Sequence, residues 1–580
     1  MLRQTSRSFA EFLFSSCCSA TLLLGLAGAA AATPLQDRLA AATKLIESGK
    51  PKAALKDLEK YVRDFPAQPE GWILFGRALH ESDRAAEALE KFRHASQLAG
   101  GMPLAAYHAA RACDRLEKLD EAFDWLDRAI ETGFDKWALL RSDKELERCR
   151  ADERFSHRVP FSLDPKKPFV EPVVVLHDLY GELTEGRFGW SAADMGDVDG
   201  DGVADFAVGA PLHTDQFKQG GKVYVFSGNN GREIHGASAS DDELMGWSIG
   251  LTGDVNKDGK RDFWAAAPGQ NGLTGALYVM TCADGVQLKR LPGQGTNDRF
   301  AEFVCPLGDL DGDGIDELVI AAPGNDANGE DCGRLYVASL VDGSVFATFE
   351  GMAPLDRLGG GGVAAWMAGK ELRIAAGASK AGEDRKGLIY VWSSLEKSEP
   401  RILAGDAAAR ARAGRLSYAL DFDGDGERDL FASDEILDTP SFASSQLWAW
   451  SGKSGELLLK LASPLSGDGF ARTLAPVFDV DGDGRPELAI GAWRSKRGGP
   501  YAGGVTLHSG DAAAKGKVVA RVTGGLAHGG IGFTVTPLSD MDGDRLPELL
   551  VSAPLDTSRG PRAGRVWVIA GKSLRAQAAK

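Results

Sequence analysis

Six short segments of the sequence repeat one arrangement of acidic residues. The first, residues 197–205, reads DVDGDGVAD and places aspartate at positions 1, 3, 5 and 9. A loop with this spacing curls its carboxylates around one point, and cages of about six to eight oxygen ligands suit Ca²⁺. Position 7 would add a backbone carbonyl, position 9 a bidentate carboxylate, and glycine at position 6 permits the left-handed backbone of a tight loop. The pattern therefore predicts structural calcium sites rather than acidic turns that are merely solvated.

The other five segments are DVNKDGKRD (254–262), DLDGDGIDE (309–317), DFDGDGERD (421–429), DVDGDGRPE (479–487) and DMDGDRLPE (540–548). The predicted ligands are Asp197, Asp199, Asp201, Val203, Asp205, Asp254, Asn256, Asp258, Lys260, Asp262, Asp309, Asp311, Asp313, Ile315, Glu317, Asp421, Asp423, Asp425, Glu427, Asp429, Asp479, Asp481, Asp483, Arg485, Glu487, Asp540, Asp542, Asp544, Leu546 and Glu548. EF-hand loops close with an acid at position 12, so these loops are a different class. We expect up to six Ca²⁺ ions, one for each loop.

Two of the six loops depart from the pattern. In the second loop, Asn256 is neutral and Lys257 replaces the usual glycine, so we expect weaker binding there. The last loop has Arg545 at a position where a positive φ is expected, at a cost of about 1 kcal/mol.

The acidic segments mark a longer repeat. Their start-to-start intervals are 57, 55, 112, 58 and 61 residues, and the interval of 112 contains a degenerate copy, LGGGGVAAWMAGKELRIAAGA (358–378). Seven units result, each with a first strand, the loop, an apolar second strand, a third strand such as KVYVFSG (222–228) and a shorter fourth strand. This repetition predicts a seven-bladed β-propeller over residues 171–572. The last unit lacks its fourth strand, which EPVVVLHDLYG (171–181) would supply to close the ring.

First strands of the repeat also start with glycine and an aromatic residue, as in FGWSAA (188–193), and second strands end in GAP or a variant, as at 209–211. This order of Gly-aromatic strand, acidic loop and GAP turn resembles the FG-GAP repeats of integrin α-subunit propellers and of many secreted bacterial proteins. The resemblance covers about 400 residues. It implies a seven-bladed propeller with calcium sites in the hairpin loops between the first two strands of its blades.

A helical domain precedes the repeats, over residues 36–158. Ala54, Ala88 and Ala122 lie 34 residues apart in similar frames, a period typical of tetratricopeptide repeats. The middle copy resembles that family most closely, at Trp72, Phe75, Gly76, Ala88, Phe92 and Ala95. Residues 137–155 look like a closing helix pair. Such arrays bind peptides or other proteins along a concave face; a spacer, or a dock for the neighbouring domain, is the alternative.

The N-terminus has the layout of a secretory signal peptide. Arg3 and Arg7 precede an apolar run from about Phe12, which ends in alanines up to Ala32. We expect residues 1–32 to be cleaved and the protein to be secreted or periplasmic, at the cell envelope. An uncleaved anchor, the only membrane contact that we expect, is the alternative. The net charge of −16 argues against nucleic acid as a partner.

The sequence also contains two short motif matches and one pair of basic loops. GWSIG (246–250) matches the GxSxG pattern of hydrolases, but Ser248 belongs to the repeated first strand, and GKS (571–573) lacks the upstream glycine of a phosphate-binding loop. The loops after the GAP positions of the sixth and seventh units are basic. Their cations form a candidate ligand rim of Arg494, Lys496, Arg497, Arg559 and Arg562. We expect this rim to meet an acidic protein surface or an anionic glycan, unless these are solvated loop charges.

The predicted fold is multidomain, with an all-α tetratricopeptide-like helical array followed by an all-β seven-bladed propeller. The expected function is that of a secreted, calcium-binding, non-catalytic binding or scaffold protein with protein or glycan partners, as in cell adhesion. The sequence predicts no catalytic residue and no cofactor besides Ca²⁺. An extracellular propeller enzyme acting on polysaccharide is the first alternative, because fold does not fix function. An envelope assembly protein whose helices recruit a partner is the second.

Overall fold

The computed structural model describes residues 34–579, apart from 99–101, 132–133, 135–136, 153–154, 156–167, 215–217, 271, 273, 369–370, 383–386, 397, 405–414, 434–443, 500 and 527. Two compact units divide the chain, Met1–Ser162 and Leu163–Lys580. The first contains the helical array and the second the β-propeller, so the predicted fold class is confirmed. The signal peptide predicted for residues 1–32 lies outside the described residues. No helix within the described ranges combines the length and the apolar character that crossing a membrane requires.

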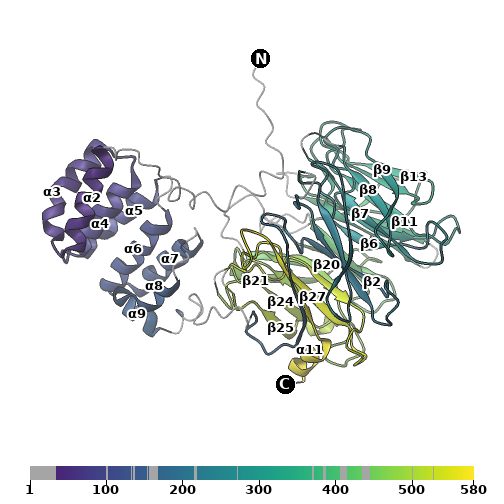
Figure 1. The fold of residues 1–580 in the computed structure, drawn as a ribbon. Coiled ribbons are helices and arrows are strands. Elements are labelled where there is room, and N and C mark those ends of the chain that lie inside the picture. Colours follow the sequence, from purple (N-terminus) through teal and green to yellow (C-terminus); the bar gives the residue numbers. More distant parts are fainter. Residues whose placement is uncertain are drawn as a thin grey trace, which may run out of the picture. The chain divides into compact units, whose positions relative to one another are not determined.

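The helical array is a series of consecutive helices that contact their neighbours in the chain (Figure 1). Its elements are α2 (Pro34–Glu47), α3 (Pro51–Asp64), α4 (Pro69–His80), α5 (Ala85–Ser96), α6 (Met102–Arg115), α7 (Leu119–Glu131), α8 (Trp137–Ser142), the 3₁₀ turn η1 (Lys144–Leu146) and α9 (Glu147–Ala151). Proline starts α3 and α4, where its missing N–H removes no helical hydrogen bond. A Cβ on Gly76 would lie 2.5 Å from the ring of Phe92, so only glycine allows α4 and α5 to approach this closely.

The propeller consists of seven four-stranded antiparallel sheets. Blade 1 is β2 (Ser191–Gly196), β3 (Asp205–Ala210), β4 (Lys222–Phe226) and β5 (Glu233–Ser238); blade 2 is β6 (Ile249–Leu251), β7 (Asp262–Ala267), β8 (Ala276–Thr281) and β9 (Gln287–Pro292); blade 3 is β10 (Val304–Gly308), β11 (Glu317–Ala322), β12 (Arg334–Ala338) and β13 (Val345–Glu350); blade 4 is β14 (Leu358–Ala368), β15 (Glu371–Ala378), β16 (Leu388–Trp392) and β17 (Arg401–Ala404). Blade 5 is β18 (Arg415–Leu420), β19 (Asp429–Ser433), β20 (Ser444–Trp450) and β21 (Leu457–Ser466); blade 6 is β22 (Phe470–Pro476), β23 (Leu488–Ala492), β24 (Gly504–His508) and β25 (Val518–Thr523), with the turn η4 (Ala512–Ala514); blade 7 is β26 (Val535–Leu538), β27 (Glu548–Ala553), β28 (Arg565–Ile569) and β1 (Val175–Tyr180).

The first strands of the blades contact one another around the ring, for example β26 with β2, β2 with β6, and β14 with β18. The last blade takes its fourth strand from before the first blade. β1 pairs antiparallel with β28, from Val175 opposite Ile569 to Tyr180 opposite Arg565. This pairing joins the start of the propeller to its end and leaves neither strand with an open edge there.

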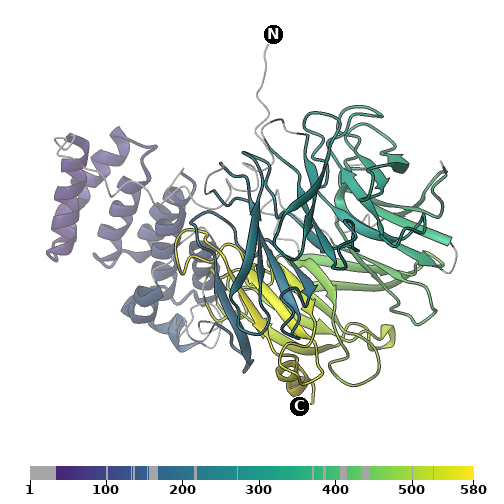
Figure 2. The same ribbon diagram turned by 45° about the vertical axis from the view of Figure 1, so that its right-hand side comes forward.

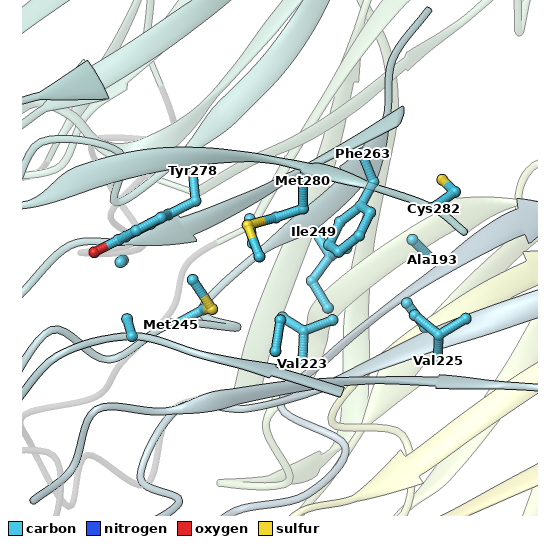
Figure 3. Packing of buried hydrophobic residues seen from close by; sticks show 14 of the residues in the cluster. Ala193, Val223, Val225, Met245, Ile249, Phe263, Tyr278, Met280 and Cys282 are labelled. Carbon is cyan, nitrogen blue, oxygen red and sulfur yellow. The ribbon is translucent and has the colours of Figure 1, made fainter. Parts of the chain in front are cut away.

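Apolar cores fill the space between neighbouring blades. Figure 3 shows the core between blades 1 and 2, where Val223 and Val225 of β4 pack with Phe263 and Met280. The second strands β3, β7, β11 and β27 are buried along their whole length. Burial on both faces explains why these strands read as continuous apolar runs in the sequence instead of alternating.

A short helix, α11 (Gly571–Ala578), follows the last blade and lies beside β25 (Figures 1 and 2). Leu574 is fully buried in the core between blades 6 and 7. The sequence pattern did not predict this helix, because eight residues are too few to show a helical period.

Candidate metal-binding loops and binding face

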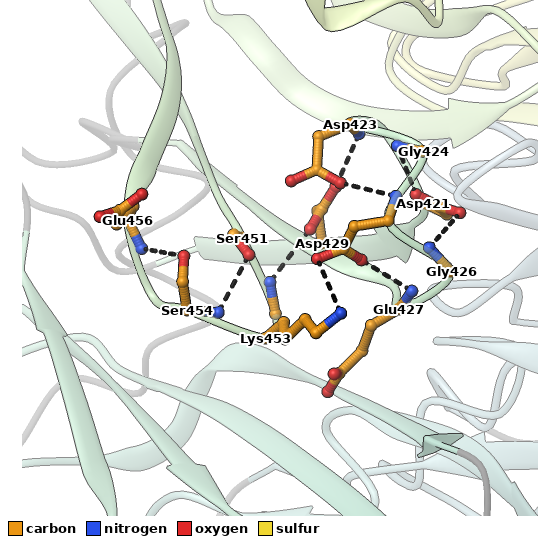
Figure 4. Close-up of polar contacts among 12 residues, drawn as sticks. Asp421, Asp423, Gly424, Gly426, Glu427, Asp429, Ser451, Lys453, Ser454 and Glu456 are labelled. Atoms are coloured by element: carbon orange, nitrogen blue, oxygen red, sulfur yellow. Dashed lines mark hydrogen bonds and ion pairs between the residues drawn. The ribbon is translucent and has the colours of Figure 1, made fainter.

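The acidic segments form the hairpin loops between the first and second strands of blades 1, 2, 3, 5, 6 and 7. In the blade 1 loop, both carboxylate oxygens of Asp197 accept backbone hydrogen bonds, from Gly200 N at 2.7 Å and from Gly202 N at 3.0 Å. The amides of positions 5 and 7 donate to the side chains of positions 3 and 5. The same scheme recurs in the blade 5 loop, where Asp421 and Asp423 fold back onto their own loop (Figure 4). The spacing of the acids thus determines the shape of the loop.

The backbone has a positive φ at positions 4 and 6, for example 82° at Gly200 and 88° at Gly202. Lys257 takes this conformation at position 4 of the blade 2 loop, with φ 60°, and Arg545 takes it at position 6 of the blade 7 loop, with φ 69°. The strain predicted for Arg545 therefore exists. The fold of the loop overrides the local preference of these side chains.

Carboxylate oxygens gather closely in five of the six loops. Within each group, one oxygen per residue lies within 4.8 Å of the others; the groups are Asp197, Asp199 and Asp205; Asp309, Asp311 and Glu317; Asp421, Asp423 and Asp425; Asp479, Asp481, Asp483 and Glu487; and Asp540, Asp542, Asp544 and Glu548. Blades 6 and 7 bring all four acids of the loop together, whereas Asp201, Asp313 and Asp429 lie outside the groups of their loops. Oxygen-only donor sets of this kind suit a hard divalent cation.

The blade 2 loop is different. Within the described residues, Asp254, Asp258 and Asp262 do not form such a group. The amide of Asn256 donates to Asp258 Oδ2 at 2.9 Å, which ties this carboxylate to its neighbour in the loop. The blade 2 loop, in which Asn256 replaces an acid, is thus also the loop whose carboxylates lie farthest from forming one group.

The closing acids at position 9 are buried beneath their loops and accept a hydrogen bond from the amide of position 2. The second oxygen of Asp205 also accepts, from Gly228 N at 2.9 Å. The second oxygens of the other closing acids, Asp262 Oδ1 and the Oε1 atoms of Glu317, Glu487 and Glu548, are buried without a hydrogen-bond partner in the described part of the chain, whereas Asp429 Oδ1 accepts from Gly452 N. A buried carboxylate oxygen without a donor is costly, so a cation in the loop would satisfy it.

Burial raises the pKa of the closing carboxyls in all six loops. The pKa of Asp429 rises to about 6, and those of Glu487 and Glu548 to about 7. For the two glutamates, the neighbouring aspartates of the loop raise the pKa further. A positive charge among these acids would favour their ionised form. The loops therefore fit a divalent cation both in their donor atoms and in their electrostatics, and the position-7 carbonyls stay predicted ligands.

A second candidate site lies at the opposite end of the blades. The ring of Trp190, just before β2, has its centroid 4.9 Å from that of Trp247 and 4.8 Å from that of Phe533. The guanidinium of Arg472 lies 3.9 Å from the centroid of Phe533. We call these four residues, from blades 1, 2, 7 and 6, the aromatic cluster. Sequence reasoning assigned the Gly-aromatic positions to the repeat alone and missed the cluster, although glycine precedes all three aromatic residues.

The predicted rim cations lie on two loops, after β23 and after β27. Their contacts are Arg494 with the ring of Trp493 (4.2 Å to the centroid), Lys496 with Tyr501 (6.0 Å), Arg559 with Tyr180 (4.1 Å) and the ion pair of Arg562 with Glu185 (3.3 Å). Arg497 is exposed. The two loops are thus each braced by their own neighbours, and cations over aromatic faces keep part of their charge available to a partner.

The helical array contains a cavity of about 640 Å³ between α5 and α7. Its lining is Arg93, Ser96, Gln97, Glu121, Asp124, Trp125 and Arg128. Arg93 pairs with Glu121, and the guanidinium of Arg128 lies 4.8 Å from the ring centroid of Trp125. These residues lie outside the small and aromatic positions that define the repeat, so the sequence pattern did not single them out.

The repeats match a known family. The FG-GAP repeat family covers residues 189–226, 300–337 and 470–508. Integrin alpha-V of Gallus gallus is 26% identical over 274 residues, which are 44% of this chain and 21% of that protein. Integrin alpha-IIb of Homo sapiens is 32% identical over 168 residues, which are 26% of this chain and 16% of that protein. The chain thus spans about a fifth or less of the length of these relatives.

Among solved structures, MamA MSR-1 C2 aligns with 17% of this chain and 56% of its own chain, at 19% identity and a TM-score of 0.16. The three segments that match the FG-GAP family lie in blades 1, 3 and 6, and each runs from the first strand of its blade to the third. Three blades of the propeller therefore contain FG-GAP repeats, the chain is similar to integrin α subunits over part of its length, and a helical array precedes the propeller.

Proposed function

We propose that the protein is a calcium-stabilised, non-catalytic binding protein that presents one face of its propeller to a protein partner at the cell envelope. The gathering of carboxylate oxygens in the hairpin loops carries this proposal. The buried, unpartnered Oε1 atoms of Glu317, Glu487 and Glu548 support it, because they lack any other group to satisfy them among the described residues. Ca²⁺ is the ion that best fits a flexible loop with only oxygen ligands.

The aromatic cluster supports a protein partner. Tryptophan and arginine are enriched among the residues that contribute most to protein interfaces, where binding encloses them in well-packed pockets. Trp190 and Trp247 are half-buried, while Phe533 and Arg472 are buried beside them. The cluster lies at the end of the first strands away from the acidic loops, so an ion at the loops would stabilise the blades without covering this face.

The binding role is tested by capturing proteins from envelope extracts with the full chain, either in 1 mM Ca²⁺ or in chelator. This calcium concentration is about ten times a Kd of ~0.1 mM. The double variant Trp190→Ser and Trp247→Ser removes the cluster, and Phe346→Ser, at an exposed phenylalanine of β13, is the matched control. We expect a partner that the wild type and the control retain in Ca²⁺ and the double variant loses. Equal capture by all three chains would overturn the role of this face.

The rim cations are proposed to extend the binding face toward an acidic protein surface or an anionic glycan. Serine at all five rim positions, Arg494, Lys496, Arg497, Arg559 and Arg562, should lower affinity for heparin, used as the probe. It should also flatten the dependence of binding on salt, since each lost cation removes a screened attraction. If the variant binds heparin with the affinity and salt dependence of the wild type, the rim cations are not a binding site.

The helical array is proposed to bind a peptide or protein, and the cavity between α5 and α7 supports this role. Gln97→Trp would fill the cavity from its exposed edge while leaving the helix cores intact. Partners of the array should be lost by this variant and kept by the aromatic-cluster variant. If Gln97→Trp retains every partner, the cavity is not the site.

Export is proposed from the signal-peptide pattern. The exported protein should appear outside the cytoplasm without residues 1–32, so that its first residue lies near position 33, as read by mass spectrometry. A protein recovered in the envelope with residue 1 intact would indicate the uncleaved anchor instead, and one recovered in the cytoplasm would contradict export.

A further inference from the structure

The GKS segment at residues 571–573 places a lysine against the acidic loop of blade 7. Lys572 Nζ forms an ion pair with Asp542 Oδ2 and lies 3.7 Å from Asp544 Oδ2. Both aspartates belong to the group in which all four acids of the loop gather, together with the buried Glu548. A cationic group thus already sits beside the carboxylates that would bind Ca²⁺.

The helix α11 fixes this lysine in place. Leu574 is buried in the core between blades 6 and 7, and Ser573 Oγ donates to Ala570 O at 2.7 Å. Further along the helix, Arg575 donates to the backbone oxygen of Asp479 at 2.6 Å, which belongs to the blade 6 loop. Gln577 accepts from Arg521 N of β25 at 3.1 Å. The lysine is therefore held at its loop by a helix that is docked at several points.

The residue at the equivalent position, which follows the glycine after the third strand, varies among the blades. In blade 1 it is Asn229, whose neutral amide donates to Asp201 Oδ2 at 3.0 Å. In blade 5 it is Lys453, whose Nζ lies 3.9 Å from Asp425 Oδ2, beside the loop in Figure 4. In blade 6 it is Asp511, an acid. This one position therefore places a neutral amide against the blade 1 loop and a cation against the blade 5 and blade 7 loops.

We propose that Lys572 is an internal cation of the blade 7 loop, which lowers the affinity of this loop for Ca²⁺ below that of the blade 6 loop and supports the loop without the ion. This inference rests on the proposed calcium function. Blades 6 and 7 are the right pair to compare, because each gathers four acids closed by a glutamate whose Oε1 has no hydrogen-bond partner among the described residues. At the position after the third-strand glycine, blade 6 has Asp511 and blade 7 has Lys572. A divalent ion entering the blade 7 loop must displace the ammonium or bind beside it, and like charges at such distances repel.

Calorimetric titration of the full chain with Ca²⁺ tests the proposal. Lys572→Asn copies blade 1 and should tighten one site by about tenfold, the effect of a single charge about 4 Å away that solvent partly screens. The reciprocal variant Asn229→Lys should weaken one site by a similar factor. Lys572→Arg keeps the charge and should behave as the wild type, and Lys517→Asn, at an exposed lysine of the loop before β25, is the matched control.

Adding Glu548→Gln to Lys572→Asn assigns the tightened site, because it should abolish the gain, whereas Glu487→Gln should not. Melting in chelator gives a second readout: Lys572→Asn should melt below the wild type without Ca²⁺ and recover with it. An isotherm of Lys572→Asn that equals that of the wild type overturns the inference and leaves the calcium function intact. A wild type that binds no Ca²⁺ overturns the calcium function and the inference with it.

Discussion

The residues that matter most to the candidate sites are the closing acids of the loops. Their position in the chain is predictable, because the spacing 1, 3, 5 and 9 sets the local backbone hydrogen bonds that fold the loop. Which acids gather is not predictable from spacing, since it depends on contacts such as that of the Asn256 amide with Asp258. The role of Lys572 could not be predicted from the sequence for a similar reason. The lysine lies beside the acidic loop because helix α11 packs there, and the GKS motif in which it occurs does not indicate this packing.

Glu487→Gln tests the closing acids at the scale of one residue. The change keeps the shape and removes the charge, so Ca²⁺ affinity of one site should fall by about tenfold or more, while melting in chelator should not fall, because a neutral group is cheaper to bury. Calcium titration and thermal melting measure the two effects. Glu456→Gln, at an exposed residue after β20, is the control, and identical calcium isotherms for both variants would contradict the site.

His108 gives a prediction on pH for the helical array. It is buried and stacked on Phe92, with centroids 5.3 Å apart, and burial together with Arg111, Arg77 and His80 lowers its pKa well below the usual value. The unfolded chain therefore binds a proton near pH 6.5 that the folded array does not, so stability is lost as pH falls below this value. At pH 5.5 the loss should be about 1.4 kcal/mol from this residue.

His108→Phe should remove that part of the pH dependence, with hydrogen exchange in α5 and α6 as the readout. The stability of the variant at pH 7.5 separates a packing effect from the protonation effect, because only the latter changes with pH. A variant as sensitive to acid as the wild type would show that His80 or other groups carry the effect.

At the scale of elements, the seven blades follow from the repeated strands and turns, and the degenerate unit retains its blade because its flanking strands stay apolar. The aromatic cluster could not be predicted in the same way. Trp190 and Phe533 are 343 positions apart and meet only because the ring closes. Contacts of this kind depend on blade number and closure, which local patterns do not encode.

An ion pair between β1 and β28 allows the closure of the propeller ring to be tested. The guanidinium of Arg565 is buried and donates to Asp178 through Nε and Nη2, at 2.7 and 2.6 Å. Asp178→Asn leaves this charge without its counter-ion and should lower the free energy of unfolding by about 2 kcal/mol, less than for a fully buried pair because Asp178 is partly exposed. Urea unfolding measures the change.

The matched control for this element is Glu185→Gln, which breaks the exposed pair with Arg562. Exposed pairs contribute about 0–1 kcal/mol, so this variant should be close to the wild type. If Asp178→Asn is no less stable than Glu185→Gln, the buried pair does not hold the closing strand.

At the scale of the whole molecule, the two units should respond differently to calcium, because the candidate loops all lie in Leu163–Lys580. A site with a Kd of about 0.1 mM adds about 1.4 kcal/mol in 1 mM Ca²⁺, and several such sites add in the same ring. Calcium should therefore raise the stability of the propeller, whereas the stability of the helical array should not depend on it.

The most direct measurement is the thermal unfolding of the full chain in 1 mM Ca²⁺ and in chelator, followed by hydrogen exchange so that each unit is read separately. Our account predicts that Ca²⁺ raises the unfolding temperature of the propeller by several degrees and leaves that of the helical array unchanged. Propeller unfolding at the same temperature in both conditions would contradict it.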